Sequence, residues 1–351
     1  MPSGAAAAVL PTVPLSPPSV PRWLSVALSL ALAGGLLWLA LRGADLAAVG
    51  DALADGAWGW LAPYVLAGVA SVAVRAWRWG LLIDALPGRD RRVGLGLTSA
   101  AVAIGYLVNY AVPRLGELAR AAHVSRRTDA PLAGVVGTVV AERVLDVIAL
   151  ALALLSVAVF WGDRVRDLLT EAAANVGGML AAPPVWALAL GALALAAAVG
   201  LAAVLVRQRG RLAEAVASFR DGLASVGRTG RAGSVVVSTV ALWACYGLMA
   251  DLPLRLLGLS AEYGLSVADA WAVMAVGGIG MALPAPGGTG SFHYATVQAL
   301  TLLFGIAVTP AATYALLVHA AGLMFYAALG GAALVAQGTS FASVTRAARQ
   351  A

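Results

Sequence analysis

Long apolar stretches alternate with short polar segments along almost the whole chain. Nine stretches are candidate membrane helices, at 24–41, 58–83, 95–112, 134–161, 183–206, 233–257, 268–284, 290–306 and 310–335. Most of them approach the roughly 20 residues that a helix needs to cross the hydrocarbon core of a bilayer. The pattern therefore predicts an all-α polytopic membrane protein, and the first stretch is too long for a cleaved signal sequence.

The distribution of arginine conflicts with nine crossings. Cytoplasmic loops collect positive charge, but nine crossings would place Arg-rich loops on both sides of the membrane. Two helical hairpins that enter and leave on the same side remove the conflict. The first covers 95–127 and turns at 109–113, and the second covers 268–306 and turns at 284–290. Six spanning helices and two re-entrant hairpins then remain, with both termini cytoplasmic.

Proline and glycine support both turns, because a continuous helix tolerates neither at this density. The predicted tip residues are Pro113, Gly116, Pro284 and Pro286. The order span, span, hairpin, span occurs twice, in halves at about 21–161 and 183–335. Each half makes an odd number of crossings, so the second half is inverted relative to the first. Inverted repeats with broken helices are typical of transporters.

The remaining segments complete the predicted organisation. Residues 1–20 carry no charged side chain and are expected to form a disordered tail, followed by a single transmembrane domain at 21–335. Residues 207–232 combine arginines with apolar residues at helical spacing. This pattern fits either a basic amphipathic helix on the cytoplasmic lipid surface or a solvated connecting helix. Residues 336–351 are expected to be a cytoplasmic tail.

Composition agrees with a membrane protein and excludes other classes. The 351 residues are 61% hydrophobic and only 11% charged, with a formal charge of +6. Soluble domains carry about 25% charged residues. The basic residues are all arginines and lie mostly in predicted cytoplasmic loops, which argues against nucleic-acid binding. The lone Cys245 excludes a disulfide within the chain.

Charged side chains inside the apolar segments are the candidate functional residues, because charge at this depth is costly. Arg75 is expected to point into the protein. Arg78 either does the same or extends to lipid headgroups, with Trp77 and Trp79 anchoring the interface. The first hairpin and the span after it carry Asn109, Arg114, Glu117, Arg120, Glu142, Arg143 and Asp146. Arginines beside a broken turn are suited to bind an anion, although a structural ion-pair network is the alternative.

The second hairpin tip is the most distinctive string in the chain. It contains Gly287, Gly288 and Gly290, which permit close approach of backbone, followed by His293. His293 is expected to bind phosphate, move a proton or satisfy a buried carbonyl. Asp251 and His319 are weaker candidates in neighbouring spans. No nucleotide-binding loop, paired-histidine metal motif or nucleophile elbow occurs, so neither an enzyme nor a bound cofactor or metal is expected.

Taken together, these strings resemble the lysylphosphatidylglycerol synthase transmembrane family, also called flippase-like domain proteins. The resemblance covers residues from about 24 to 335 and rests on Arg75 to Trp79, Asn109 to Arg120, Glu142 to Asp146, and Pro286 to Phe292. It implies a membrane module that moves a lipid across the bilayer. In multidomain relatives, a separate soluble domain performs aminoacyl transfer, and this chain has no room for one after its last span. The family commonly has Glu where this chain has His293.

The leading hypothesis is therefore a translocator of lipids with a phosphate-bearing headgroup, working by alternating access in the cell membrane. Its expected partners are membrane lipids, and a separate lipid-modifying enzyme fits the resemblance. One alternative is a membrane-embedded enzyme, or a partner of one, in lipid-linked glycan metabolism. The other is a transporter of small solutes or ions that uses the same inverted hairpins.

Overall fold

The computed structural model describes residues 22–86, 91–112, 115–164, 166, 227, 229–283 and 285–350. These residues are all-α, and no strand occurs among them. Four helices are long and apolar enough to cross a membrane: α3 (Leu61–Asp84) with the preceding turn η1 (Trp58–Trp60), α6 (Leu132–Phe160), α10 (Ala232–Leu256) and α14 (Val308–Ala336). Their ends lie within two residues of the predicted spans.

The first predicted span, at 24–41, is the first member of a bent pair of helices. α1 (Arg22–Leu41) is followed by α2 (Leu46–Ala54), and the apolar segments Ser29–Leu41 and Leu46–Ala54 meet at 79°. Asp45 caps α2, since its carboxylate accepts the backbone N–H of Ala47 at 2.9 Å. The described chain thus holds four candidate spans, or five if this bent pair is one span. The predicted tail at 1–20, the span at 183–206 and most of the segment at 207–232 lie outside the described residues.

Each predicted hairpin is a pair of short antiparallel helices. The first hairpin consists of α4 (Leu95–Ala111) and α5 (Leu115–Ser125), whose backbones touch where Gly105 faces Gly116. The second hairpin consists of α12 (Val267–Ala282) and α13 (Ser291–Gln298), with Gly280 against the backbone of Ser291. Its glycine-rich tip, residues 285–290, includes the short turn η2 (Pro286–Gly288). A single π-helical turn, η3 (Ala299–Leu303), follows α13.

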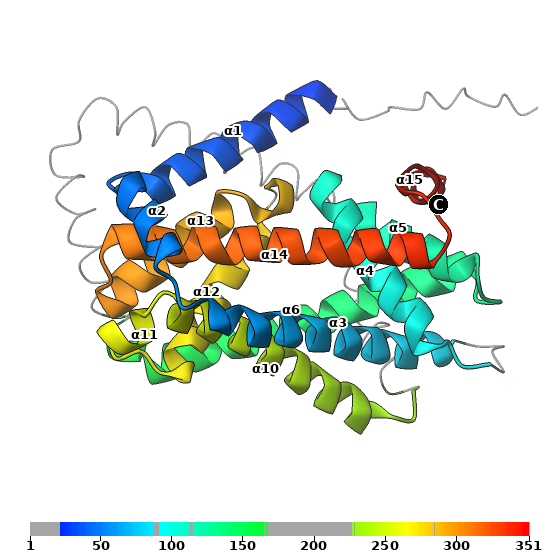
Figure 1. The fold of residues 1–351 in the computed structure, drawn as a ribbon. Coiled ribbons are helices and arrows are strands. Elements are labelled where there is room, and N and C mark those ends of the chain that lie inside the picture. The colour runs from blue at the N-terminus through cyan, green and yellow to red at the C-terminus, as the bar shows by residue number, and fades with distance from the viewer. Residues whose placement is uncertain are drawn as a thin grey trace, which may run out of the picture.

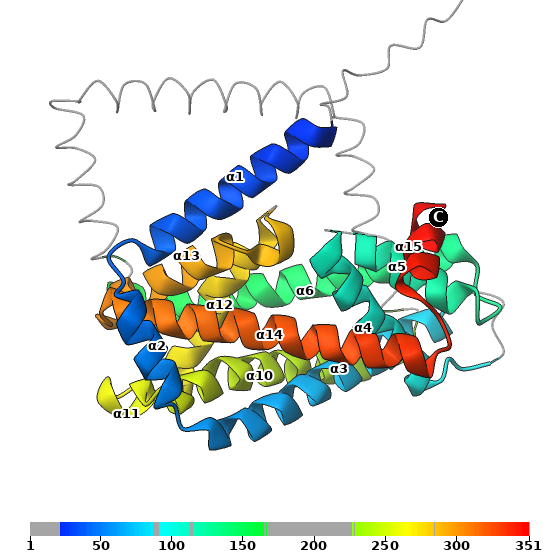
Figure 2. The same ribbon diagram turned by 45° about the horizontal axis from the view of Figure 1, so that its top comes forward.

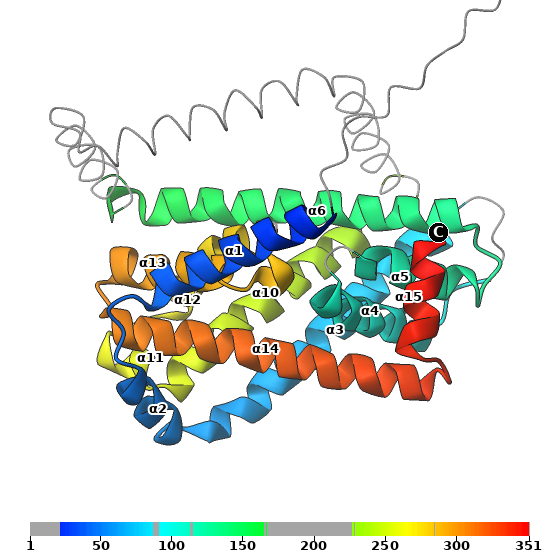
Figure 3. The ribbon, with the colours of Figure 1, turned by 90° about the horizontal axis from the view of Figure 1, so that it is seen from above.

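The helices form an elongated bundle (Figure 1). α3 and α10 pack side by side, α14 runs along the bundle, and α4 lies between α3, α5 and α14. α1 lies over α13, as Figure 2 shows. Seen from above, α6 forms one long edge of the bundle (Figure 3). The short α11 (Leu259–Glu262) follows α10, and α15 (Phe341–Arg349) packs on α5 at one end.

The apolar pattern of α3 explains how it holds the first hairpin. Val72, Ala76, Trp79 and Ile83 recur every three or four residues, so they share one face. This buried face packs against α4, α5 and α6.

Trp79 does not have the interface role that one sequence-based alternative assigned to it. The residue does not anchor a membrane interface, because it is fully buried and its indole donates to Thr138 Oγ1 at 3.0 Å. Its neighbour Trp77 is 44% exposed, as an interface residue would be.

Candidate functional site

Two arginines of α3 lie inside the bundle. Arg78 is 0% exposed and Arg75 is 5% exposed, so neither side chain extends to the membrane surface. The expectation that Arg75 points inward is confirmed, and the headgroup alternative for Arg78 is wrong. The physical reason is the spacing on α3, which places both guanidinium groups on the side that faces α6 and α10.

The carboxylates that neutralise these arginines come from α6. Glu142 is fully buried and pairs with Arg75. Asp146, one turn further, accepts from Arg75 Nη2 at 3.1 Å and from Arg78 Nη2 at 2.6 Å. Glu142 and Asp146 therefore share a face at a spacing of four residues, as the sequence predicted. Arg143 lies between them, and its Nη1 is 3.6 Å from Asp146 Oδ2.

The first hairpin contributes the third buried arginine. Arg120 on α5 donates from Nη1 to Glu142 Oε2 at 2.9 Å. Its guanidinium group also stacks on the Trp79 ring, with Cζ 4.6 Å from the ring centroid. Glu142 thus forms ion pairs with an arginine of α3 and an arginine of α5. These pairs hold the first hairpin against the rest of the bundle. Pairing of this kind offsets the cost of burying the charges.

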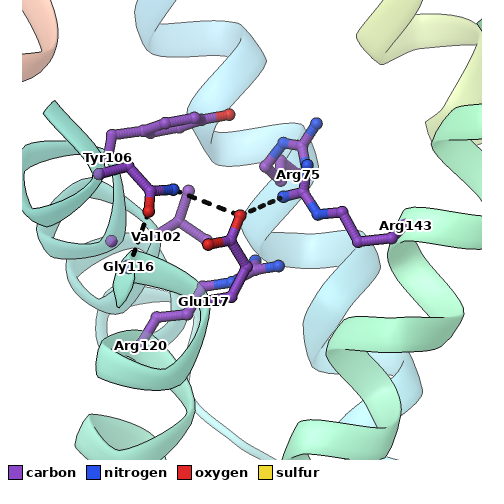
Figure 4. Close-up of a pocket in the computed structure, with 9 residues that line it drawn as sticks. Arg75, Val102, Tyr106, Gly116, Glu117, Arg120 and Arg143 are labelled. Carbon is purple, nitrogen blue, oxygen red and sulfur yellow. Dashed lines mark hydrogen bonds and ion pairs between the residues drawn. The ribbon is translucent and has the colours of Figure 1, made fainter. Parts of the chain in front are cut away.

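Asn109 bridges the two arms of the first hairpin next to its turn. Its Oδ1 accepts the Gly116 backbone N–H at 2.8 Å, and its Nδ2 donates to Glu117 Oε1 at 3.3 Å. Gly116 is required here, because a Cβ at this position would collide with the Gly105 carbonyl oxygen. Figure 4 shows Glu117 pointing away from α5 toward Arg143, with 4.0 Å between Glu117 Oε1 and Arg143 Nη2.

A small pocket lies where these groups meet (Figure 4). Its volume is about 10 Å³, which is room for roughly one water molecule. The lining residues are Arg75, Val102, Gly105, Tyr106, Asn109, Gly116, Glu117, Arg120 and Arg143. Arg143 is the most accessible charged member, with 45% of its side chain exposed.

The charged cluster carries an excess of positive charge. Among the described residues, four guanidinium groups (Arg75, Arg78, Arg120 and Arg143) are joined to three carboxylates (Glu117, Glu142 and Asp146), which leaves one positive charge over. Three pocket residues also have a buried polar atom without a hydrogen-bond partner. These atoms are Arg75 Nε, Glu117 Oε2 and Arg120 Nη2. Such atoms are costly unless a ligand or water meets them.

The glycine-rich tip forms a separate group, next to α1 rather than within the charged cluster. Gly287, Gly288 and Gly290 have φ values of 58°, 74° and 80°, which are the left-handed values that favour glycine. Gly290 packs against the Ala33 carbonyl of α1, and Gly287 packs against the Tyr110 ring of α4. The Gly290 N–H donates to His293 Nδ1 at 3.3 Å. The two hairpins therefore meet through Tyr110, and none of the tip residues lines the pocket.

Not every predicted residue can be placed. Pro113, Arg114 and Pro284 lie outside the described residues. Pro286 begins η2 at the tip. Asp251 is buried and pairs with Arg255 of the same helix, with 2.6 Å between Oδ2 and Nε.

Three contributors to the site were not singled out from the sequence. Tyr246 and Thr239, both on α10, accept hydrogen bonds from Arg75 at 2.9 Å and from Arg78 at 3.1 Å. Tyr106 lines the pocket from α4. The sequence signal for these three residues is only that each is a polar side chain within an apolar segment. That signal is too weak to predict a place in the site.

Comparison with known protein families identifies the family of the chain. The sequence profile of the family described as "Lysylphosphatidylglycerol synthase TM region" matches residues 26–330. The chain belongs to this family. The match covers both hairpins, the charged cluster, three of the four long apolar helices and most of α14, so the family is that of a multi-pass membrane protein. No curated protein and no solved structure matches the chain.

Proposed function

We propose that the protein is a translocator of membrane lipids whose headgroups carry phosphate. The observation that carries the proposal is the excess positive charge of the cluster beside a pocket with an unpartnered guanidinium nitrogen, Arg120 Nη2. Phosphate oxygens are the ligands that arginine binds best, through two parallel hydrogen bonds. The family name links the chain to lipid metabolism, which favours a lipid phosphate over a soluble one.

The proposed topology has six crossings and two hairpins that do not cross. α4 and α12, with 17 and 16 residues, are short for a full span, and each is followed by a helix that folds back along it. With α1, α3, α6, α10 and α14 as crossings, the sixth is the apolar segment at 183–206. In this arrangement the two halves are inverted, the protein lies in the cell membrane, and both termini face the cytoplasm.

The charged cluster requires the protein to change conformation during transport. A pocket of about 10 Å³ holds no lipid headgroup, so the present structure corresponds to a closed state. Arg143 is the half-exposed member of the cluster and would meet the headgroup first. The headgroup would then replace the contact of Arg143 with Glu117, which is already long at 4.0 Å. Acyl or prenyl tails would stay in the bilayer.

The exterior of α6 suits this role. Val147, Leu152, Leu155 and Val159 are exposed apolar side chains on the same helix that carries Glu142 and Asp146. A lipid tail can therefore follow α6 while its headgroup meets the cluster. We propose no catalytic step, and any enzyme that modifies the lipid would be a separate partner chain.

Reconstitution of the purified protein into liposomes tests the proposal. The measurement is the rate at which fluorescently labelled phospholipid becomes accessible to a membrane-impermeant quencher. Wild type and Arg42→Gln, which changes an exposed arginine outside the cluster, should both move lipid. Glu117→Gln and Arg143→Gln should slow this movement. If wild-type protein moves no lipid class, or if the two cluster variants match Arg42→Gln, the proposed mechanism is wrong. Turnover of a lipid-linked substrate by the purified chain would instead favour the enzyme alternative.

A further inference from the structure

Two imidazole rings meet behind the glycine-rich tip, and the proposed headgroup site uses neither. The ring centroids of His293 on α13 and His319 on α14 are 4.6 Å apart. His293 is buried and His319 is partly buried. Histidine is the side chain whose ordinary protonation equilibrium lies closest to neutral pH. A pair of such rings within a membrane protein is a candidate site for a transported or sensed proton.

Both rings hold the same piece of backbone. His293 Nδ1 accepts the Gly290 N–H at 3.3 Å, and His319 Nε2 lies 3.5 Å from Thr289 Oγ1. Because Nδ1 acts as acceptor, His293 carries its proton on Nε2 in this conformation. A second proton at Nδ1 would remove that acceptor and leave the Gly290 N–H without its partner. The conformation of the tip is therefore linked to the protonation of the pair.

The segments that surround the two rings offer no other group that would bind a proton near neutral pH. α1 meets the tip with Ala33 and Leu37, and η3 contains no titratable residue. The neighbouring titratable groups include three tyrosines. Tyr294 follows His293 in sequence, and the hydroxyls of Tyr64 and Tyr110 lie near Gly322, one turn after His319. Tyrosine hydroxyls do not ionise near neutral pH.

Carboxylates on the packed helices are engaged elsewhere. Asp269 of α12 binds Ser266, Asp251 of α10 binds Arg255, and Asp45 before α2 caps that helix. Asp51 on α2 is exposed. No carboxylate among the described residues has a contact with either ring in the structure. Two imidazoles this close accept one proton more readily than two, because the second adds a like charge.

The tip also touches the first hairpin. Gly287 packs against the Tyr110 ring, with 3.1 Å from a Cβ position on Gly287 to Tyr110 Cδ1. Tyr110 follows Asn109, which bridges the two arms of the first hairpin and binds Glu117 in the pocket. A change of the tip backbone would therefore reach the pocket through a single packed side chain.

We propose that His293 and His319 bind one proton between them and that this proton couples lipid translocation to a proton gradient. The inference rests on the proposed lipid translocation. The proton enters from water on the acidic side, forms an N–H bond at His293 Nδ1 and breaks the Gly290 contact. It leaves to water on the other side once the tip has moved, so no other group changes its protonation state over a cycle.

Histidine NMR tests the proton site independently of transport. The chain has only three histidines, so ¹⁵N-histidine labelling of the full protein in nanodiscs gives three ring systems to follow. We expect the His293 and His319 signals to titrate together and to take up one proton between them. His319→Gln should change the titration of His293, and His123→Gln should leave it unchanged. Two rings that titrate independently, each near the ordinary value of about 6.5, would overturn the inference.

Transport in vesicles with an imposed pH difference tests the coupling. The quantity compared is the ratio of lipid translocation rates with and without the gradient, for wild type, His293→Gln, His319→Gln and the control His123→Gln. Glutamine at position 293 can still accept the Gly290 N–H but cannot titrate. For one coupled proton, a difference of one pH unit shifts the equilibrium of lipid between the two leaflets about tenfold. We expect a clear response in wild type and His123→Gln, and a ratio near 1 in the other two.

The outcomes separate the two proposals. Proton coupling is rejected if the gradient does not change the rate of lipid movement in wild type, or if the response persists in His293→Gln. The proposed lipid translocation would be unaffected by either result. An absence of lipid movement in every sample rejects the translocator, and the coupling with it.

Discussion

Arg120 Nη1 lies 2.9 Å from Glu142 Oε2, and this contact joins the second arm of the first hairpin to the long helix α6. The other oxygen of the same carboxylate pairs with Arg75 of α3. One buried carboxylate therefore holds three helices in register. A hairpin that moves relative to α6 must exchange this contact for another, and a headgroup phosphate is a suitable replacement for Glu142 as the partner of Arg120.

Removing the central carboxylate should destabilise the protein strongly. Glu142→Gln would leave Arg120 buried without its counter-charge and Arg75 with Asp146 alone, and loss of one partner from a buried ion pair costs about 3–5 kcal/mol. The measurement is unfolding of the purified protein in detergent. Asp51→Asn, which neutralises an exposed carboxylate, is the control and should change stability little. Equal stability of the two variants would mean that the cluster does not hold the helices together.

The close approach of α4 and α5 depends on a glycine. In Gly116→Ala the added methyl would collide with the Gly105 carbonyl oxygen and lie 2.6 Å from Asn109 Cγ. We expect a loss of about 1–3 kcal/mol in unfolding free energy, as for other overpacked sites. Gly137→Ala on α6 adds the same methyl where no atom lies within 4 Å, so it should be neutral or slightly stabilising. A Gly116→Ala protein as stable as Gly137→Ala would show that the hairpin is open.

The contact of the glycine-rich tip with α1 should add to the cost of its backbone conformation. Gly290 and Gly264 both have positive φ, at 80° and 64°, but only Gly290 has neighbours, since its Cβ would strike the Ala33 carbonyl oxygen. Gly264→Ala should cost about 1–2 kcal/mol from backbone conformation alone. Gly290→Ala should cost clearly more in the same thermal unfolding assay. Equal costs would place α1 away from the tip.

Arg143 should matter for transport more than for stability. Its side chain is 45% exposed and its contacts with carboxylates are 3.6–4.0 Å long, so Arg143→Gln should change the unfolding free energy by no more than about 1 kcal/mol. Lipid translocation by the same preparation should nevertheless fall well below that of Arg42→Gln. A variant that unfolds early, with transport reduced only in proportion to its folded fraction, would assign Arg143 a structural role.

Much of the fold followed from the sequence because its signals are local. The spans α3, α6, α10 and α14 are long apolar runs, and both hairpins are marked by proline and glycine next to runs too short to cross easily. The bend between α1 and α2 was not predicted. Its signals are short, namely the Asp45 cap and Gly43, which has φ 88°.

The site was predicted less completely, because its contacts join distant segments. Arg75 and Tyr246 are separated by 171 positions, and Arg78 and Thr239 by 161. No periodicity within one helix indicates such pairs. The sequence grouped the α3, α5 and α6 charges correctly, because charge inside a membrane must be paired. The glycine-rich tip, the most distinctive string in the sequence, lies outside the pocket and meets the first hairpin at Tyr110.

The most direct test of the central claim compares two lipids in one assay. Liposomes with wild-type protein would carry fluorescently labelled phosphatidylglycerol or a labelled monohexosyl diacylglycerol with the same acyl chains, so that the lipids differ in headgroup phosphate. An excess positive charge at the pocket predicts rapid movement of the phosphate-bearing lipid and slow movement of the neutral one. It also predicts that Arg143→Gln reduces this difference. Equal rates for the two lipids in wild-type protein would contradict a site that recognises phosphate.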